Sequence, residues 1–519
     1  MHKVPVLITG AGPAGMLLAV QLARNGVRSM LIERNSSTTK WPKMDVTNCR
    51  SMELYRRLRI ADGFRQQGVR QDCSFDVLFS TGLSDGGELV SKWDLASPNE
   101  WRDRIKSQND GSMPREPYQR CSQSIFEAWL KQHIEEEPLI SVHFGLRFET
   151  FQETVGGIES IAIATEDGTE HTILNTDWKS LDPEEVIAQV LGGSGDPCPI
   201  TVDEILVSSC WRPSIAVADQ FASKSLRVFL AGDSAHQNIP TGGYGMNTAV
   251  GDSFDLGWKL AAVINGGGGS HLLQSYEMER KPIAIQNIER SGVHFKVHQD
   301  YVGWVTEAGP ELILSQSIQA KELKERIHHH VQEHAGENQD HGIEMGYRYN
   351  NSPIILRPGD ASKEPQWSHR NYIASTWPGS RAPHLFLSDG KTSIFDHFGQ
   401  GFTLVDFSQD GKWAARFTET AKHIGIQLKP VHLPQETTAR KVWGRDAVLI
   451  RPDDFVSWRA SEEGYEEDIE HILRVAAGYK ASDVDGTAHV IQDVKTKGFT
   501  STVGNVKQDG IKLTAAFQK

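Results

Sequence analysis

The first thirty-three residues alternate short apolar runs with one stretch of helical periodicity. Val4–Thr9 is a β-prone run, and Ser29–Ile32 is a second run that ends at Glu33. Between them, Pro13–Asn25 carries apolar residues at helical spacing, and Gly26 follows as a stop signal. This pattern predicts a strand, a tight glycine-rich turn, a helix packed on a sheet, and a second parallel strand.

A second apolar run lies far downstream and ends in an acidic residue. Leu226–Ala231 is β-prone and is followed by Gly232, Asp233 and the glycine-rich segment Gln237–Asn247. Asp252–Ile264 then has apolar residues on most sides, which predicts a buried helix. Residues 345–480 alternate β runs with helical segments and predict a separate α/β module.

Composition and charge narrow the class of protein. The chain has 519 residues, enough for roughly three domains at about 150 residues each. Its formal net charge is −13, and we expect no nucleic-acid partner because no long basic block is present. The five cysteines form no CxxC pair, and no apolar stretch reaches the length of a membrane span. We therefore expect a cytoplasmic protein with no membrane span and no metal site.

The turn Gly10–Gly15 reads GAGPAG and carries the chemistry of nucleotide binding. Its glycines permit a tight turn and let backbone amides approach a pyrophosphate at a helix N-terminus. Glu33 follows about 20 residues later, where a carboxylate accepts the hydroxyls of a ribose. This fingerprint predicts a dinucleotide site but leaves NAD and FAD open.

The downstream turn predicts a second ligand cradle. Asp233 can accept hydrogen bonds from the hydroxyls of a sugar chain. The backbone amides near Gly245, Met246 and Asn247 can meet a flat, electron-accepting ring at the positive end of a helix. An NAD dehydrogenase would explain the first turn but gives no account of this second one.

Both turns resemble the class A FAD-dependent aromatic hydroxylases, the para-hydroxybenzoate hydroxylase and phenol hydroxylase type. GAGPAG with Glu33 is similar to their first FAD motif, and GDSAHQNIPTGGYGMN is similar to their second. Pro42–Ile60, Arg120–Leu130 and Ser275–Ala284 are similar to the segments between and after these motifs. The similarity runs through most of residues 1–480.

The resemblance implies an α/β fold with three parts. A Rossmann-like (GR2-type) FAD-binding domain is assembled from residues 1–75, 118–175 and 224–300. A truncated β-sheet substrate domain is inserted, and a helical linker leads to a C-terminal thioredoxin-like α/β domain. The remaining predicted ranges are 76–117 and 176–223 for the substrate domain, 301–344 for the linker, 345–480 for the thioredoxin-like domain and 481–519 for a tail. The thioredoxin-like domain has no cysteine, which leaves packing and dimerisation as its roles.

The resemblance also implies roles for individual residues. The first turn binds the FAD pyrophosphate and Glu33 the ribose, while Asp233 binds the ribityl or pyrophosphate region. Arg50 and Arg120 lie near phosphate or ribityl groups, and Gln123 holds the ribityl chain. Pro240 occupies the position whose carbonyl faces the substrate and the flavin edge. The full predicted cofactor set is Gly10, Gly12, Pro13, Ala14, Gly15, Glu33, Arg34, Arg50, Arg120, Gln123, Gly232, Asp233, Gly243, Gly245, Met246 and Asn247.

Several of these residues also fit structural interpretations. Arg50 can pair with Glu53 on a solvated helix face. We interpret His236 as a structural group rather than a general base. A polar segment holds His328, His329, His330, Glu333 and His334, with His341 following it. We interpret this segment as a solvated helix rather than a metal site, although His330 and His334 share a helix face.

One block typical of the family is absent. Class A hydroxylases carry an Asp-Gly motif with a following Ser and Arg before the second FAD motif, and none of the Asp-Gly pairs here has that context. Asp167-Gly168 sits in a predicted hairpin, and Asp389-Gly390 belongs to the C-terminal module. The chain then passes almost directly from Leu174 to Asp177 and a helix that relatives place after the substrate sheet. Either an exon was dropped from the gene model, or the deletion is genuine.

The resemblance implies hydroxylation of a phenolic or aromatic small molecule in aromatic catabolism or polyketide tailoring. FAD would be reduced by NAD(P)H and would react with O2 through a flavin C4a-hydroperoxide. Two alternatives stay open: an uncoupled flavin oxidase, and an inactive paralogue that serves as a binding module. A homodimer is compatible with the hydroxylase and with both alternatives.

Overall fold

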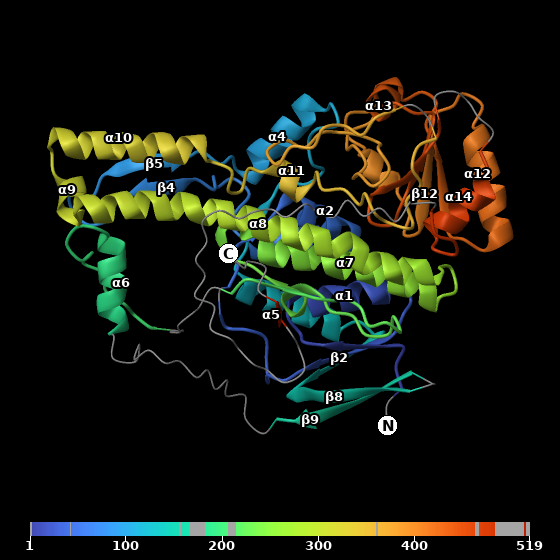
Figure 1. The fold of residues 1–519 in the computed structure, drawn as a ribbon, viewed down its shortest axis with the longest axis horizontal. Helices are drawn as coiled ribbons and strands as arrows, with labels where there is room; N and C mark the ends of the chain where they lie inside the picture. The colour runs from blue at the N-terminus through green and yellow to red at the C-terminus, as the bar shows by residue number, and fades with distance from the viewer. Residues whose placement is uncertain are drawn as a thin grey trace.

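The computed structural model of the chain describes residues 3–41, 43–154, 157–165, 182–205, 214–359, 362–461, 467–482 and 513–514. The predicted hairpin around Asp167, the Leu174–Asp177 junction and most of the 481–519 tail lie outside these ranges. Figure 1 shows an N-terminal α/β layer, a pair of long helices crossing it, a smaller body at one end of these helices, and a C-terminal α/β unit.

A short parallel sheet forms the base of the N-terminal layer. Its order is β1-β2-β7, with β1 at Val6–Thr9, β2 at Ser29–Glu33 and β7 at Ile140–Phe144. Helix α1 (Pro13–Arg24) packs between this sheet and helix α7, as the first apolar pattern predicts. Three more helices complete the layer, α2 (Cys49–Arg57), α3 (Ala61–Gln67) and α5 (Gln123–Glu135), with the short antiparallel pair β3 (Val46–Thr47) and β6 (Gln119–Arg120).

The prediction of a strand before the second turn is wrong. Residues 226–231 form no named strand and do not pair with β1. The chain instead folds back locally, because Ser223 N donates to Val228 O at 2.8 Å and Leu230 N donates to Phe221 O at 2.8 Å. The sheet therefore stops at β1, and Leu7 on that strand is 36% exposed.

The second turn and its helix follow this hairpin. Gly232–Ser234 forms a single 3-10 turn, and Thr241–Gly243 forms another. Helix α7 runs from Tyr244 to Ile264, starting eight residues before the predicted Asp252. Short strands β10 (Ala216–Ala218) and β11 (His236–Gln237) pair beside the turn, and β10 also pairs with β16 (Leu513–Thr514).

A smaller body holds two strands and several helices. The hairpin β4 (Val77–Ser80) and β5 (Leu89–Trp93) packs against α10, as Figure 1 shows. The other members are α4 (Pro98–Gln108), α6 (Pro183–Gly192), α8 (Ser270–Ala308), α9 (Pro310–Leu314), α10 (Ile318–Glu333) and α11 (His341–Glu344). A separate hairpin, β8 (Leu146–Thr154) with β9 (Gly157–Ala164), extends from the N-terminal layer.

Helix α10 is amphipathic, so its interpretation as a solvated helix is wrong. Ala320, Leu323, Ile327 and Val331 are buried, and the last three join a cluster with Trp93. His330 and His334 do share a face, with ring centroids 4.6 Å apart, as their spacing predicts.

The C-terminal unit contains a four-stranded sheet of order β13-β12-β14-β15. β12 (Phe402–Asp406) is parallel to β13 (Leu428–His432) and antiparallel to β14 (Ala447–Ile450), which is antiparallel to β15 (Val456–Arg459). The short turn Ile394–His397 and the helices α12 (Lys412–Ile424), α13 (Thr437–Trp443) and α14 (Ile469–Ala476) complete the unit.

A buried ion-pair cluster joins the N-terminal layer to the C-terminal unit. Glu53 on α2 accepts from Arg381 Nε at 2.8 Å and from Arg50 at 3.1 Å. Arg50 also contacts Asp454 at 3.2 Å. The cationic partners hold the pKa of Glu53 down at about 2 despite its burial. Removing one member of such a cluster leaves an uncompensated buried charge, so the cluster fixes how the two units meet.

Candidate functional site

The first glycine turn leaves open space where a ligand can approach. Gly10 has φ +103°, a conformation that favours glycine, and a Cβ at Gly10 or Gly12 would meet nothing within 4 Å. Gly15 differs, because a Cβ there would lie 2.0 Å from the Gly10 carbonyl oxygen. Gly12 is the N-cap of α1 and Pro13 its first residue, so Ala14 and Gly15 supply helix-start amides. The open side of the turn thus fits a phosphate group, while Gly15 serves the packing of the turn itself.

Glu33 lies at the carboxyl end of β2, beside this turn. Its carboxylate accepts from Ala11 N at 2.8 Å and from Asn35 N at 2.9 Å. The side chain is partly buried, which leaves oxygen lone pairs for a ribose hydroxyl. The neighbouring Arg34 is exposed, and its carbonyl accepts from Thr165 at 2.8 Å.

The second turn sits directly against the first. A Cβ added at Gly232 would lie 3.3 Å from Ala14 Cβ and 3.1 Å from Ala249 Cβ. Ser253 on α7 donates to the Ala14 carbonyl at 2.8 Å. Asp233 is exposed on this turn. Two stretches more than 200 residues apart in sequence therefore meet at the N-terminus of α1.

A buried carboxylate that the sequence reasoning missed fixes the second turn. Asp252 is fully buried and accepts from His236 Nε2 at 2.7 Å, Gly232 N at 3.1 Å and Arg280 Nε at 2.8 Å. His236 and Arg280 hold the pKa of Asp252 down at about 2. His236 is 3% exposed and bonded to Asp252, which agrees with its interpretation as a structural group.

The loop between Asn238 and Asn247 is held at its middle and at its C-terminal end. Gly242 N donates to the Glu337 carboxylate at 2.6 Å, a contact that only the folded chain reveals. Asn247 accepts from Asn48 N at 3.0 Å and donates to the Val46 carbonyl at 3.0 Å. The start of α7 is thereby joined to β3 and α2.

The other residues of this loop occupy different surroundings. Gly243 is the left-handed N-cap of α7, with φ 64°. A Cβ at Gly245 would lie 3.1 Å from the Asn238 side-chain oxygen, and Met246 packs on the main core. Pro240 is exposed.

Three polar side chains that were predicted to contact the cofactor bind other protein side chains instead. Arg50 is 4% exposed inside the interdomain cluster, so its predicted place near phosphate is wrong. Its pairing with Glu53 is present, but on a buried face rather than a solvated one. Arg120 donates to Asp45 at 2.6 Å, and Gln123 donates to Glu127 at 2.6 Å.

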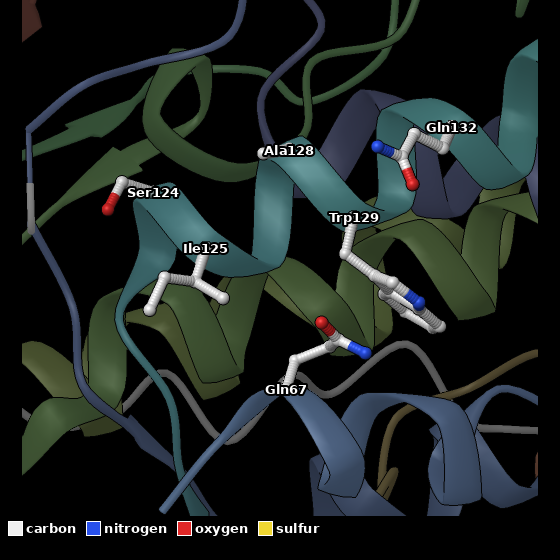
Figure 2. Close-up of a pocket in the computed structure, with 6 residues that line it drawn as sticks. All are labelled: Gln67, Ser124, Ile125, Ala128, Trp129 and Gln132. Carbon is white, nitrogen blue, oxygen red and sulfur yellow. The ribbon is translucent and has the colours of Figure 1, made fainter.

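One cavity of about 360 Å³ lies away from these turns. Figure 2 shows its lining on α5 together with Gln67 at the end of α3. None of the predicted cofactor residues lines it, so we place the candidate site at the two turns on backbone geometry and not on this cavity.

Comparison with known proteins identifies both halves of the chain. A family model described as "FAD binding domain" matches residues 3–178 and 175–291. A second model, "Aromatic-ring hydroxylase, C-terminal", matches residues 375–479. The chain is 38% identical to the FAD-dependent monooxygenase apdD of Emericella nidulans, over 91% of this chain and 90% of that protein. It is 35% identical to the FAD-dependent monooxygenase opdD of Penicillium oxalicum, over 84% and 99%.

Solved structures of flavin-dependent enzymes share the fold of this chain. The rebeccamycin biosynthetic enzyme RebC with reduced flavin superposes with a TM-score of 0.72 at 25% identity, over 92% of this chain and 99% of that one. The flavin-dependent monooxygenase PieE, solved with FAD and substrate, shares the fold with a TM-score of 0.71.

The alignments also support the missing block. The apdD alignment spans 571 positions, yet 91% of 519 residues is about 472, so about 99 positions have no residue in this chain. The two FAD-domain matches meet at residues 175–178, where the sequence predicts the break.

Several apolar side chains on or beside the described strands are exposed to solvent. They are between 36% and 66% exposed: Leu7, Leu78, Leu83, Leu89, Phe151, Ile161 and Ile163.

The family matches, the two monooxygenase relatives and the paired turns agree. The chain therefore belongs to the FAD-dependent aromatic-ring hydroxylases, with FAD as its cofactor.

Proposed function

We propose that this protein is a monooxygenase that hydroxylates a phenolic or polyketide-derived aromatic small molecule, with NAD(P)H as reductant and O2 as the oxygen source. The observation that carries the proposal is the contact between the Gly10 and Gly232 turns, which lets one elongated ligand touch both. Relatives named as a putative polyketide hydroxylase from Streptomyces halstedii and as phenol 2-monooxygenase from a Pseudomonas strain support the substrate class.

The chain's own groups divide the binding work along that ligand. The amides at the start of α1 hold the pyrophosphate, Glu33 accepts from the ribose, and Asp233 accepts from the ribityl chain. Amides of Gly245 and Met246, in the first turn of α7, direct partial positive charge at the pyrimidine edge of the ring. When bound, FAD supplies the two-electron reduction and oxygen activation of the reaction.

The loop from Asn238 to Asn247 positions the reacting edge. Glu337 fixes the Gly242 amide and Asn247 ties the helix start to β3, so the loop needs little rearrangement when the ring binds. Pro240 on this loop is exposed, which suits contact of its carbonyl with a substrate.

We further propose that the C-terminal unit is thioredoxin-like. The order β13-β12-β14-β15, with one parallel pair and two antiparallel pairs, supports this assignment. Of the cysteines described as free, none lies in this unit, which leaves packing against the FAD domain or a second copy as its role.

The test separates a hydroxylase from its alternatives. The purified protein is incubated with NADPH, an aromatic substrate panel and ¹⁸O2, and hydroxylated product and peroxide are measured against NADPH consumed. We expect one ¹⁸O atom in the product. Peroxide equal to the NADPH consumed would indicate the uncoupled oxidase, and a colourless protein that consumes no NADPH would indicate the inactive paralogue.

No helix in the described ranges combines the length and apolar character needed to cross a bilayer.

A further inference from the structure

A second cluster of chemically active side chains lies outside the cofactor site. Cys49 is the first residue of α2, while His341 and Glu344 both lie on α11. One potential ligand atom from each residue lies within 4.8 Å of the other two. The cluster brings together residues almost 300 positions apart, so it is a product of the fold and not of local sequence.

Glu344 and His341 have few polar partners among the described residues. Glu344 is 8% exposed, and its carboxylate has one ion-pair contact, with His341 Nδ1 at 3.5 Å. That distance and geometry leave His341 Nδ1 without a hydrogen bond in the described structure. Among the described residues this long contact is the one polar partner of the Glu344 carboxylate, and a buried carboxylate so weakly paired is costly.

Cys49 is also buried. It is 0% exposed, and burial together with the nearby carboxylates raises the pKa of its thiol well above the ordinary value. A backbone hydrogen bond at Tyr118 acts the other way and partly offsets this rise in the pKa of the thiol. A divalent cation would balance one thiolate and one carboxylate, leaving no net charge at the site.

We propose that Cys49, His341 and Glu344 bind one divalent transition-metal ion, with Zn²⁺ as the best match. Sulfur, imidazole nitrogen and carboxylate oxygen are the three ligand types that zinc takes in proteins. Ligand bonds of roughly 2.0–2.3 Å require the three atoms to draw slightly closer than they lie here. His341 keeps 23% of its side chain exposed, which gives the ion an entry path and a water as fourth ligand.

The ion would act as a clamp between two parts of the fold. α2 belongs to the FAD-binding layer, and α11 ends the helical segment that leads to the C-terminal unit. Trp101 packs edge-on against His341 with centroids 5.3 Å apart, so α4 supports the imidazole. Because the ligands lose protons on binding, uptake should weaken as the pH falls.

The test uses the full-length protein with zinc and cobalt as probes. After exhaustive dialysis against a chelator, the protein is titrated with Zn²⁺ and its metal content measured by mass spectrometry. We expect one tightly bound ion per chain, and with Co²⁺ a thiolate-to-cobalt charge-transfer band in the difference spectrum. Cys49→Ser should abolish that band, and His341→Gln should weaken zinc binding tenfold or more.

Two controls keep the result specific. Cys121→Ser removes another buried free thiol and should change nothing. His329→Gln removes an exposed histidine on α10 and should leave the charge-transfer band intact. If Cys49→Ser fails to fold, His341→Gln alone decides. The proposal is overturned if wild type binds no tight zinc ion, or if the His341 variant binds zinc and cobalt as wild type does.

Discussion

Replacing Asp252 with asparagine tests how the second turn is held. The substitution keeps the side-chain volume but removes the charge that faces His236, Gly232 N and Arg280. The native pKa near 2, against 3.8 for an unperturbed aspartate, corresponds to about 2 kcal/mol of favourable interaction at neutral pH. Arg280 would be left buried with one fewer carboxylate, so we expect a total loss of about 3 kcal/mol in the free energy of unfolding.

Urea unfolding followed by tryptophan fluorescence measures this loss, because 13 tryptophans are distributed along the chain. Arg474→Gln is the matched control, since it breaks the exposed pair with Glu470 and should cost less than about 1 kcal/mol. FAD affinity should fall in parallel for Asp252→Asn only, because the Gly232 turn loses its anchor. Equal stabilities of the two variants would refute the reasoning.

Three further predictions follow from the geometry. Gly12→Ala should fold normally yet bind FAD at least tenfold more weakly in a fluorescence titration. Gly15→Ala should weaken FAD binding and also lower the thermal stability of the protein. Equal thermal stability of the two variants would contradict the different surroundings of their Cβ positions. Glu337→Gln should weaken FAD binding without changing urea stability by more than about 1 kcal/mol, and unchanged affinity would exclude its role in bracing the loop. Burial lowers the pKa of His384 to about 3, so its stabilising contribution is complete above pH 6.5 and is lost as the pH falls toward 3. His384→Phe should therefore gain about 2 kcal/mol relative to wild type between pH 7 and pH 5 in urea unfolding, and parallel pH profiles would count against this.

The local pattern was sufficient for the first nucleotide turn. The apolar periodicity from Pro13 onward corresponds to α1, and the run ending at Glu33 corresponds to β2, because the apolar pattern of each element is complete within its own residues. Helix α10 was predicted as a helix, but its apolar face of Ala320, Leu323, Ile327 and Val331 was missed because polar residues separate these positions.

The remaining features depend on partners that sequence order conceals. The start of α7 at Tyr244 looked like a loop because it is rich in glycine, and it is helical where Asn247 is tied to Val46 and Asn48. Arg50 carried a plausible phosphate role until the fold supplied Asp454 from the distant C-terminal unit. Residues 226–231 read as a strand, but pairing with β1 did not follow and a local hairpin formed instead.

Titration of flavin-free protein with FAD, by calorimetry, examines the shared cofactor most directly. Wild type should bind one FAD per chain, and Glu33→Gln and Asp233→Asn should each weaken that single event roughly tenfold or more through lost hydrogen bonds to charged acceptors. Absence of binding by wild type, or an Asp233 variant with wild-type affinity, would show that the two turns do not hold one cofactor.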